Sequence, residues 1–97
     1  MRHRLILLAM RAELALAGRE EVTEAALLRR VLEALEPLSP DEEHALAKEP
    51  LTEMVGRIGE ARRQLADLVA EGSFLEARDG MFRLTATGRE LTEDLLG

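Results

Sequence analysis

The pair Asp79-Gly80 is the feature that most restricts how this chain can fold. It separates two short runs that mix apolar and polar residues, over positions 73–77 and 81–85. Both residues of an Asp-Gly pair tolerate the positive φ that a tight two-residue hairpin loop requires. The sequence therefore predicts a β-hairpin whose two strands occupy these two ranges and are joined across Arg78, Asp79 and Gly80.

Helices are predicted on both sides of the hairpin. Over residues 52–71, apolar residues recur at the three- and four-residue spacing of one buried helix face. They are Val55, Ile58, Ala61, Leu65, Leu68 and Val69. Gly72 follows at a position where helices commonly end in a left-handed residue. Thr85 is a candidate N-cap for a closing helix, which carries Leu91, Leu95 and Leu96.

The N-terminal half predicts three further helices. The first spans residues 1–17 and ends at Gly18, and the second is capped by Thr23 and ends before Pro37. The apolar stripe of the second helix is Leu27, Leu28, Val31, Leu32 and Leu35. The third is short, residues 40–48, and its start has the Ser-x-x-Glu pattern of a capping box. In that box Ser39 is the cap and Glu42 is the reciprocal partner, with Pro40 at the first helical position.

Helices, a hairpin and a closing helix in this order are the outline of a winged helix-turn-helix, mostly α with a small β-hairpin. A chain of 97 residues has room for one modest core, so we expect a single domain over residues 1–97. No uncharged apolar run reaches the roughly 18 residues of a membrane span, and we expect no membrane contact. Cysteine is absent, which fits the cytoplasmic location that we expect.

The net charge of −6 is unevenly distributed along the chain. Residues 20–55 carry ten acidic residues against three basic ones, whereas residues 1–19 are net basic. Overall acidity weakens long-range attraction to phosphate but does not prevent local contacts. The charge therefore leaves open both a nucleic-acid partner and a protein partner.

Several segments together resemble a known family. They are residues 38–43 (LSPDEE), 57–65 (RIGEARRQL), 72–75 (GSFL) and 80–91 (GMFRLTATGREL). In this order they resemble the N-terminal domain of Mrr-type restriction endonucleases, over roughly residues 10 to 92. The segment at 38–43 before the Arg-rich helix is the most discriminating, while the Leu-Thr-x-x-Gly-Arg end of the hairpin is common to many winged helices.

The resemblance implies a winged helix that recognises double-stranded DNA. In that family the recognition domain is attached to a separate PD-(D/E)xK nuclease domain, and no such motif is found in this sequence. We therefore expect DNA binding without cleavage, either by a regulator or by the DNA-reading subunit of a larger system. The competing interpretation is a winged helix that contacts proteins, as an adaptor or inhibitor, and never binds DNA.

Candidate DNA-binding residues lie on the helix over 52–71 and on the hairpin. Subtracting the buried stripe leaves Arg57, Glu60, Arg63, Gln64 and Asp67 facing outward. Arg can bridge guanine and Gln can bridge adenine in the major groove. The alternative is an ordinary solvated face on which Glu60 pairs with a residue three or four positions on. Arg78 and Arg83 flank the hairpin turn, where they could contact phosphate or the minor groove.

No set of residues predicts catalysis or metal binding. His3 and His44 are far apart, without a second ligand at metal spacing. The acids that follow Pro40 are typical of a helix start, where they favour the macrodipole. Phe74 and Phe82 alternate onto the core side of the hairpin and are interpreted as packing residues. We expect no enzyme activity, no cofactor and no metal.

The first helix is apolar on two sides. One stripe is Leu5, Leu8, Ala9, Ala12 and Leu16, and the other is Leu7, Met10 and Leu14. A helix of this kind is either central in its own fold or shared with a partner. The second stripe, completed by the closing helix, predicts a homodimer that could bind a palindromic site. In the alternative, this helix is buried on both sides within one chain.

Overall fold

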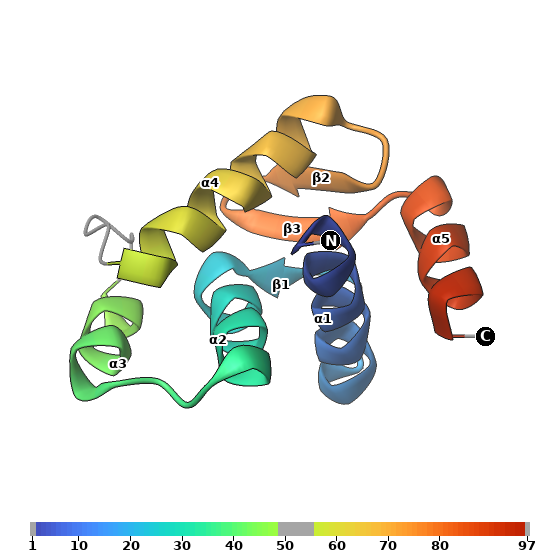
Figure 1. Cartoon of the computed structure of the whole chain (residues 1–97). Helices are drawn as coiled ribbons and strands as arrows, with labels where there is room; N and C mark the ends of the chain where they lie inside the picture. Colours follow the sequence, from blue (N-terminus) through green and yellow to red (C-terminus); the bar gives the residue numbers. More distant parts are fainter. Residues whose placement is uncertain (1, 49–55, 97) are drawn as a thin grey trace.

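The computed structural model describes residues 2–48 and 56–96, which form five helices and three short strands. The first half contains α1 (Arg2–Ala17), β1 (Val22–Thr23), α2 (Glu24–Leu35) and α3 (Pro40–Ala47). The second half contains α4 (Gly56–Glu71), β2 (Leu75–Arg78), β3 (Met81–Leu84) and α5 (Ala86–Leu96). In Figure 1, α4 lies along the hairpin of β2 and β3, α1 and α2 lie below them, and α5 packs at one end.

The predicted hairpin is confirmed. Met81 pairs with Arg78 across a two-residue turn, in which Asp79 and Gly80 both have positive φ, 53° and 77°. The strands begin and end within two residues of the predicted positions. No local sequence signal predicts β1, which pairs with β3 and completes an antiparallel sheet in the order β1-β3-β2.

Local side-chain caps fix the helix starts as predicted. The Thr23 hydroxyl accepts a hydrogen bond from the Ala26 N–H at the start of α2. The capping box of α3 is complete, with both its hydrogen bonds formed between Ser39 and Glu42. Thr85 caps α5 by accepting from the Gly88 N–H at 3.0 Å. Residues 52–55 of the helix predicted over 52–71 lie outside the described residues.

The core lies where α1, α2, α4 and the sheet meet. Its buried residues come from all of these elements, and they include Leu27, Leu32, Ile58, Leu65, Leu75 and Phe82. Phe74 packs against this core, as expected for both phenylalanines. Two members of the predicted apolar stripes, Leu16 and Leu35, are not buried. They are 73% and 67% exposed because each lies in the last turn of its helix.

The second stripe of α1 is inside the chain. Leu7 is 2% exposed and Met10 is fully buried, while Leu14 is partly buried and packs against the same core. The expectation that these residues form a homodimer interface is therefore corrected for Leu7 and Met10, because neither has side-chain surface exposed to a partner. The alternative, burial within one chain, holds for Leu7 and Met10 of the second stripe and for Ala9 of the first, while the other residues of the first stripe are partly buried or, at Leu16, exposed.

The result is a mostly helical fold with a small three-stranded antiparallel sheet. The element order and the central position of β3 are compatible with a winged-helix-like fold. Among residues 2–48 and 56–96, every helix is too short or too polar to traverse a bilayer.

Candidate nucleic-acid interface

The helix α4 and the hairpin supply all the residues that the sequence nominates for DNA contact. The buried face of α4 is formed by Ile58, Ala61, Leu65 and Leu68, which pack into the core. The remaining faces carry the polar residues, and β2 packs directly against this helix. Some of the nominated side chains on these two elements are held in ion pairs, and others are exposed without one among the described residues.

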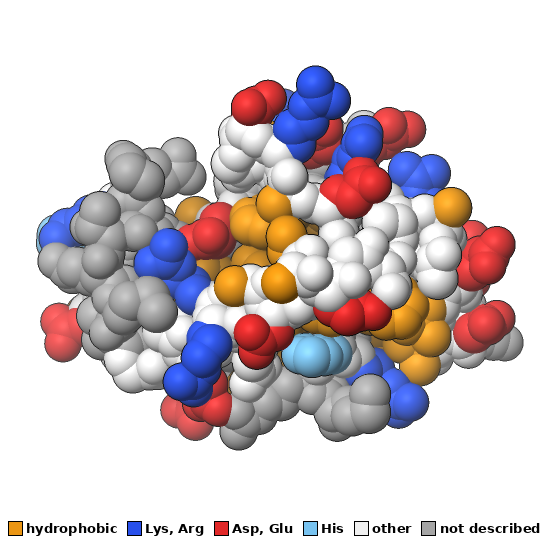
Figure 2. Space-filling view, turned by 90° about the horizontal axis from the view of Figure 1, so that it is seen from above, with side chains coloured by type: hydrophobic (Ala, Val, Ile, Leu, Met, Phe, Trp, Pro, Cys, Tyr) orange, Lys and Arg blue, Asp and Glu red, His pale blue; other side chains and the backbone are white. Residues whose placement is uncertain are grey.

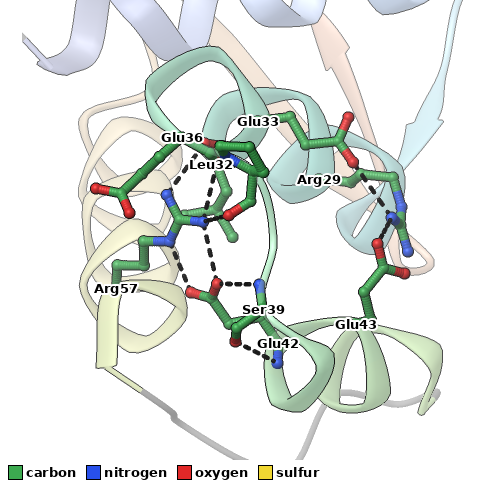
Figure 3. A network of polar contacts seen from close by, with 9 residues as sticks. Arg29, Leu32, Glu33, Glu36, Ser39, Glu42, Glu43 and Arg57 are labelled. Atoms are coloured by element: carbon green, nitrogen blue, oxygen red, sulfur yellow. Dashed lines mark hydrogen bonds and ion pairs between the residues drawn. The ribbon is translucent and has the colours of Figure 1, made fainter.

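Arg57 is not available, because neighbouring helices occupy its guanidinium. Its Nε donates to Glu42 Oε2 at 2.6 Å and its Nη2 donates to Glu42 Oε1 at 3.0 Å. The same group also donates to the backbone carbonyls of Leu32, Glu36 and Pro37 at 2.9–3.2 Å (Figure 3). The sequence places Arg57 on the outward face of α4, and in the structure its partly exposed side chain is bound by Glu42 and by the carbonyls at the end of α2. The end of α2 lies beside the start of α4, and Arg57 reaches back to it.

The ion pair shifts the pKa of both Glu42 and Arg57. The hydrogen bonds from Arg57, supported by the Ser39 N–H, lower the pKa of the Glu42 carboxyl to about 2. Hydrogen bonding to Glu42 in turn raises the pKa of Arg57. The two side chains are only 23% and 12% exposed, so this ion pair is shielded more than a typical surface pair.

Glu60 and Gln64 share the side of α4 on which Arg57 lies. Both are partly buried, and they line an apolar groove of about 400 Å³ between α4, α2 and α1. Its apolar lining consists of Leu5, Val31, Leu32, Leu35 and Ala61. Glu60 has an interaction of its own, but of the two partners in the alternative, Arg63 and Gln64, Arg63 is not bound to it.

Arg63 lies on a different side of α4, toward the sheet. Its side chain is exposed, and it has no ion-pair or hydrogen-bond partner among the described residues. It lines a shallow groove with Ala66 and Val69 of the same helix and Phe82 of β3. The nominated residues of α4 therefore fall into two groups, with Arg63 on the side nearer the hairpin. Asp67 is also exposed.

The two hairpin arginines differ from each other. Arg83 donates from Nε to Glu76 Oε2 at 2.7 Å, directly across the two strands. The turn contains only residues 79 and 80, one fewer than the predicted connection over 78–80, and this register places 76 opposite 83. Hydrogen bonding to Glu76 raises the pKa of Arg83. Arg78, next to the turn, is exposed, and its guanidinium has no ion-pair or hydrogen-bond partner within the described part of the chain.

Arg62 is a residue that the sequence pattern does not single out. Its Nε lies 2.8 Å from Glu24 Oε1, so this ion pair joins α4 to the first turn of α2. Figure 2 looks down on the molecule from the α4 side, where basic and acidic side chains alternate around patches of apolar ones. Among residues 2–48 and 56–96, no three His, Asp or Glu side chains are grouped so that they could hold a metal ion.

Comparison of the chain with protein-family models, with curated proteins and with solved structures gives no significant match. The paired and unpaired arginines of α4 and the hairpin are therefore the features of this chain that indicate a function.

Proposed function

We propose that this protein is a winged-helix module that binds double-stranded DNA, as a regulator or as the DNA-reading subunit of a larger system. Three features support the proposal. The element order and the sheet order fit a winged helix. A hairpin with a tight turn packs beside the candidate reading helix α4. The sequence also resembles the DNA-recognition domain of Mrr-type restriction endonucleases.

The observation that carries the proposal is the contrast between paired and unpaired arginines. Arg57, Arg62 and Arg83 each form an ion pair with a glutamate. Arg63 on α4 and Arg78 on the hairpin are exposed and unpaired within the described residues. Three further arginines are also exposed without an ion pair among the described residues, Arg4, Arg19 and Arg89. What distinguishes Arg63 and Arg78 is therefore where they lie, on the candidate reading helix and beside the hairpin turn. A free guanidinium can bind phosphate or guanine without first breaking an ion pair.

The proposed mode places α4 in the major groove with the hairpin over the backbone. Arg63 has the donor geometry for guanine O6 and N7, and Gln64 has the groups to bridge adenine. Arg78 contacts phosphate, which positions the module without reading sequence. Arg57 and Arg83 support the fold in this mode and do not contact bases.

A gel shift with random duplex DNA at several salt concentrations tests the proposal. We expect binding at low salt that weakens as salt rises, because phosphate contacts release counterions. Replacing Arg63 and Arg78 together with Ala should reduce the slope of log K against log salt by about one for each phosphate that is no longer neutralised. Removal of a base contact made by Arg63 should also cost about 1–3 kcal/mol of sequence discrimination.

The matched control replaces Arg19 and Arg89 with Ala. Both are exposed arginines outside α4 and the hairpin, so the formal charge changes by the same amount. If the two double variants weaken binding equally, the surface is not the one proposed. If the unmodified protein binds no duplex even at low salt, the DNA proposal fails.

The second candidate is a winged helix that contacts proteins. Two observations favour it: the net acidity, and the exposed Leu16 and Leu35 at the ends of α1 and α2. Absence of DNA binding at low salt, together with a folded chain, is the result that would favour this adaptor or inhibitor role.

A further inference from the structure

One guanidinium connects three helices of the candidate DNA-binding unit. Arg57 is the second residue of α4, Glu42 lies in the first turn of α3, and the carbonyls of Leu32, Glu36 and Pro37 lie at the end of α2 and just after it (Figure 3). Carbonyls at a helix end lack some of their helical donors, and a basic side chain can satisfy them. The contacts of Arg57 therefore fix α4 to α2 and α3 at one point.

The carboxylate in this link is itself held in place. Glu42 Oε1 accepts from the Ser39 N–H at 2.9 Å, and the Glu42 N–H donates back to Ser39 Oγ at 3.2 Å. One carboxylate thus completes the capping box of α3 and binds the guanidinium from α4. Movement of α4 relative to α3 would have to break the capping box, the ion pair or both.

The chemistry of the link requires Arg at position 57. A planar guanidinium presents donors in a fixed fork, which here serve a carboxylate on one side and three carbonyls on another. Lys carries the same charge, but its single ammonium cannot reproduce this pattern. Arg29–Glu43, which also joins α2 to α3, is by contrast a more exposed pair, at 39% and 50%.

We infer that Arg57 and Glu42 are positioning residues that set the angle at which α4 presents Arg63 and Gln64. The part of this inference that concerns DNA rests on the proposed function. The part that concerns the position of α4 rests only on the contacts above.

Glu42→Gln distinguishes positioning from simple electrostatics, because the two predict opposite changes in the affinity for DNA. Removing a negative charge reduces repulsion of phosphate, so electrostatics alone predicts equal or tighter DNA binding. Disruption of the α3–α4 link predicts weaker binding. The control is Asp41→Asn, the same charge change at the neighbouring exposed position, for which no contact with Arg57 is present.

We expect Glu42→Gln to bind random duplex roughly three- to thirtyfold more weakly than Asp41→Asn. Both are measured well below their unfolding midpoints so that every molecule is folded. Arg57→Lys, which keeps the charge, should weaken binding in the same direction and serves if Glu42→Gln does not fold. Equal affinities for Glu42→Gln and Asp41→Asn would overturn the DNA part of the inference.

Amide hydrogen exchange gives a readout that does not depend on DNA. Exchange in α3 and in the first turn of α4 should be faster in Glu42→Gln than in Asp41→Asn, while exchange in α1 should be the same. Unchanged exchange in α3 and α4 would overturn the positioning role itself. If the unmodified protein binds no DNA but exchange responds as expected, the proposed function fails and the positioning role stands.

Discussion

Arg57 of α4 and Glu42 of α3 form a two-pronged ion pair, with Nε 2.6 Å from Oε2 and Nη2 3.0 Å from Oε1. These bonds, with the Ser39 N–H, hold the pKa of the Glu42 carboxyl at about 2, against an ordinary value of 4.5. The charged form of Glu42 is therefore more stable in the folded chain than in the unfolded chain. This difference links the stability of the fold to pH.

The first prediction is an acid-dependent loss of stability that belongs to Glu42. Its pKa is lowered in the folded state, so its contribution is complete above about pH 4.5 and is lost as the pH falls through about 2. We expect the difference in Tm between the unmodified protein and Glu42→Gln to be constant at higher pH and to shrink toward zero near pH 2. Protonation of other carboxyl groups at low pH lowers the Tm of both proteins. Their contribution cancels when one Tm is subtracted from the other. A difference that stays constant down to pH 2 would contradict the assignment.

Local signals in the sequence were sufficient for most of the secondary structure. Asp79-Gly80 specified the hairpin, and Thr23, Ser39 and Thr85 each marked a helix start that the structure has. Such signals act within four residues, so a single sequence contains them in full. The strand β1 lacked any such signal. It consists of only Val22 and Thr23 and forms because β3 lies beside them.

The candidate site was harder to predict because it depends on contacts distant in sequence. Periodicity placed Arg57 opposite the apolar stripe of α4 and therefore outward. Whether an outward residue is free depends on the neighbours of that face, and the carbonyl of Leu32 that binds Arg57 is 25 positions earlier. Arg83–Glu76 depends on a nearer feature: the sequence predicted a connection over residues 78–80, whereas the turn has only 79 and 80, and this shorter turn sets the two side chains opposite each other.

The second prediction concerns the turn. Gly80 has φ 77°, and a Cβ placed there would meet no atom within 4 Å, so any cost of a larger residue is backbone strain and not a clash. We expect Gly80→Val to lower the free energy of unfolding by about 1 kcal/mol or more. Ala77→Val is the control, because it adds the same side chain at an exposed strand position. Equal urea midpoints for the two variants would refute the strain argument.

The third prediction concerns Gly88 in the first turn of α5. A Cβ at this position would lie 2.2 Å from the carbonyl oxygen of Phe74, which also accepts a hydrogen bond from the Thr85 N–H. At an open helical site Gly→Ala stabilises by up to about 1 kcal/mol. Here the clash with backbone should reverse the sign, and we expect Gly88→Ala to destabilise by about 1–3 kcal/mol. Thr87→Ala, at the exposed neighbouring position, is the control in thermal unfolding. A Gly88→Ala protein at least as stable as the unmodified one would refute the close approach of Gly88 to the Phe74 carbonyl.

The fourth prediction uses the buried side of α1. Leu7 is 2% exposed, so Leu7→Glu would place a carboxylate in the core without a partner, at a cost above about 4 kcal/mol. A domain of this size has a total stability of only about 5–15 kcal/mol, so we expect this variant to be largely unfolded. Leu16→Glu is the matched control on the same helix. Leu16 is 73% exposed, and its replacement should change stability by less than about 0.5 kcal/mol.

Circular dichroism and light scattering on the two α1 variants decide between a buried helix and a dimer interface. If α1 is buried on both sides within one chain, Leu7→Glu loses its helical signal while Leu16→Glu keeps it. A dimer held together by Leu7 would instead give a folded monomer on Leu7→Glu, with the mass halved and the helical signal intact. Leu7→Ala extends the comparison, because an apolar truncation in a packed core costs about 2–5 kcal/mol without adding charge. A Leu7→Ala protein with unchanged Tm would show that this side of α1 is not packed as described.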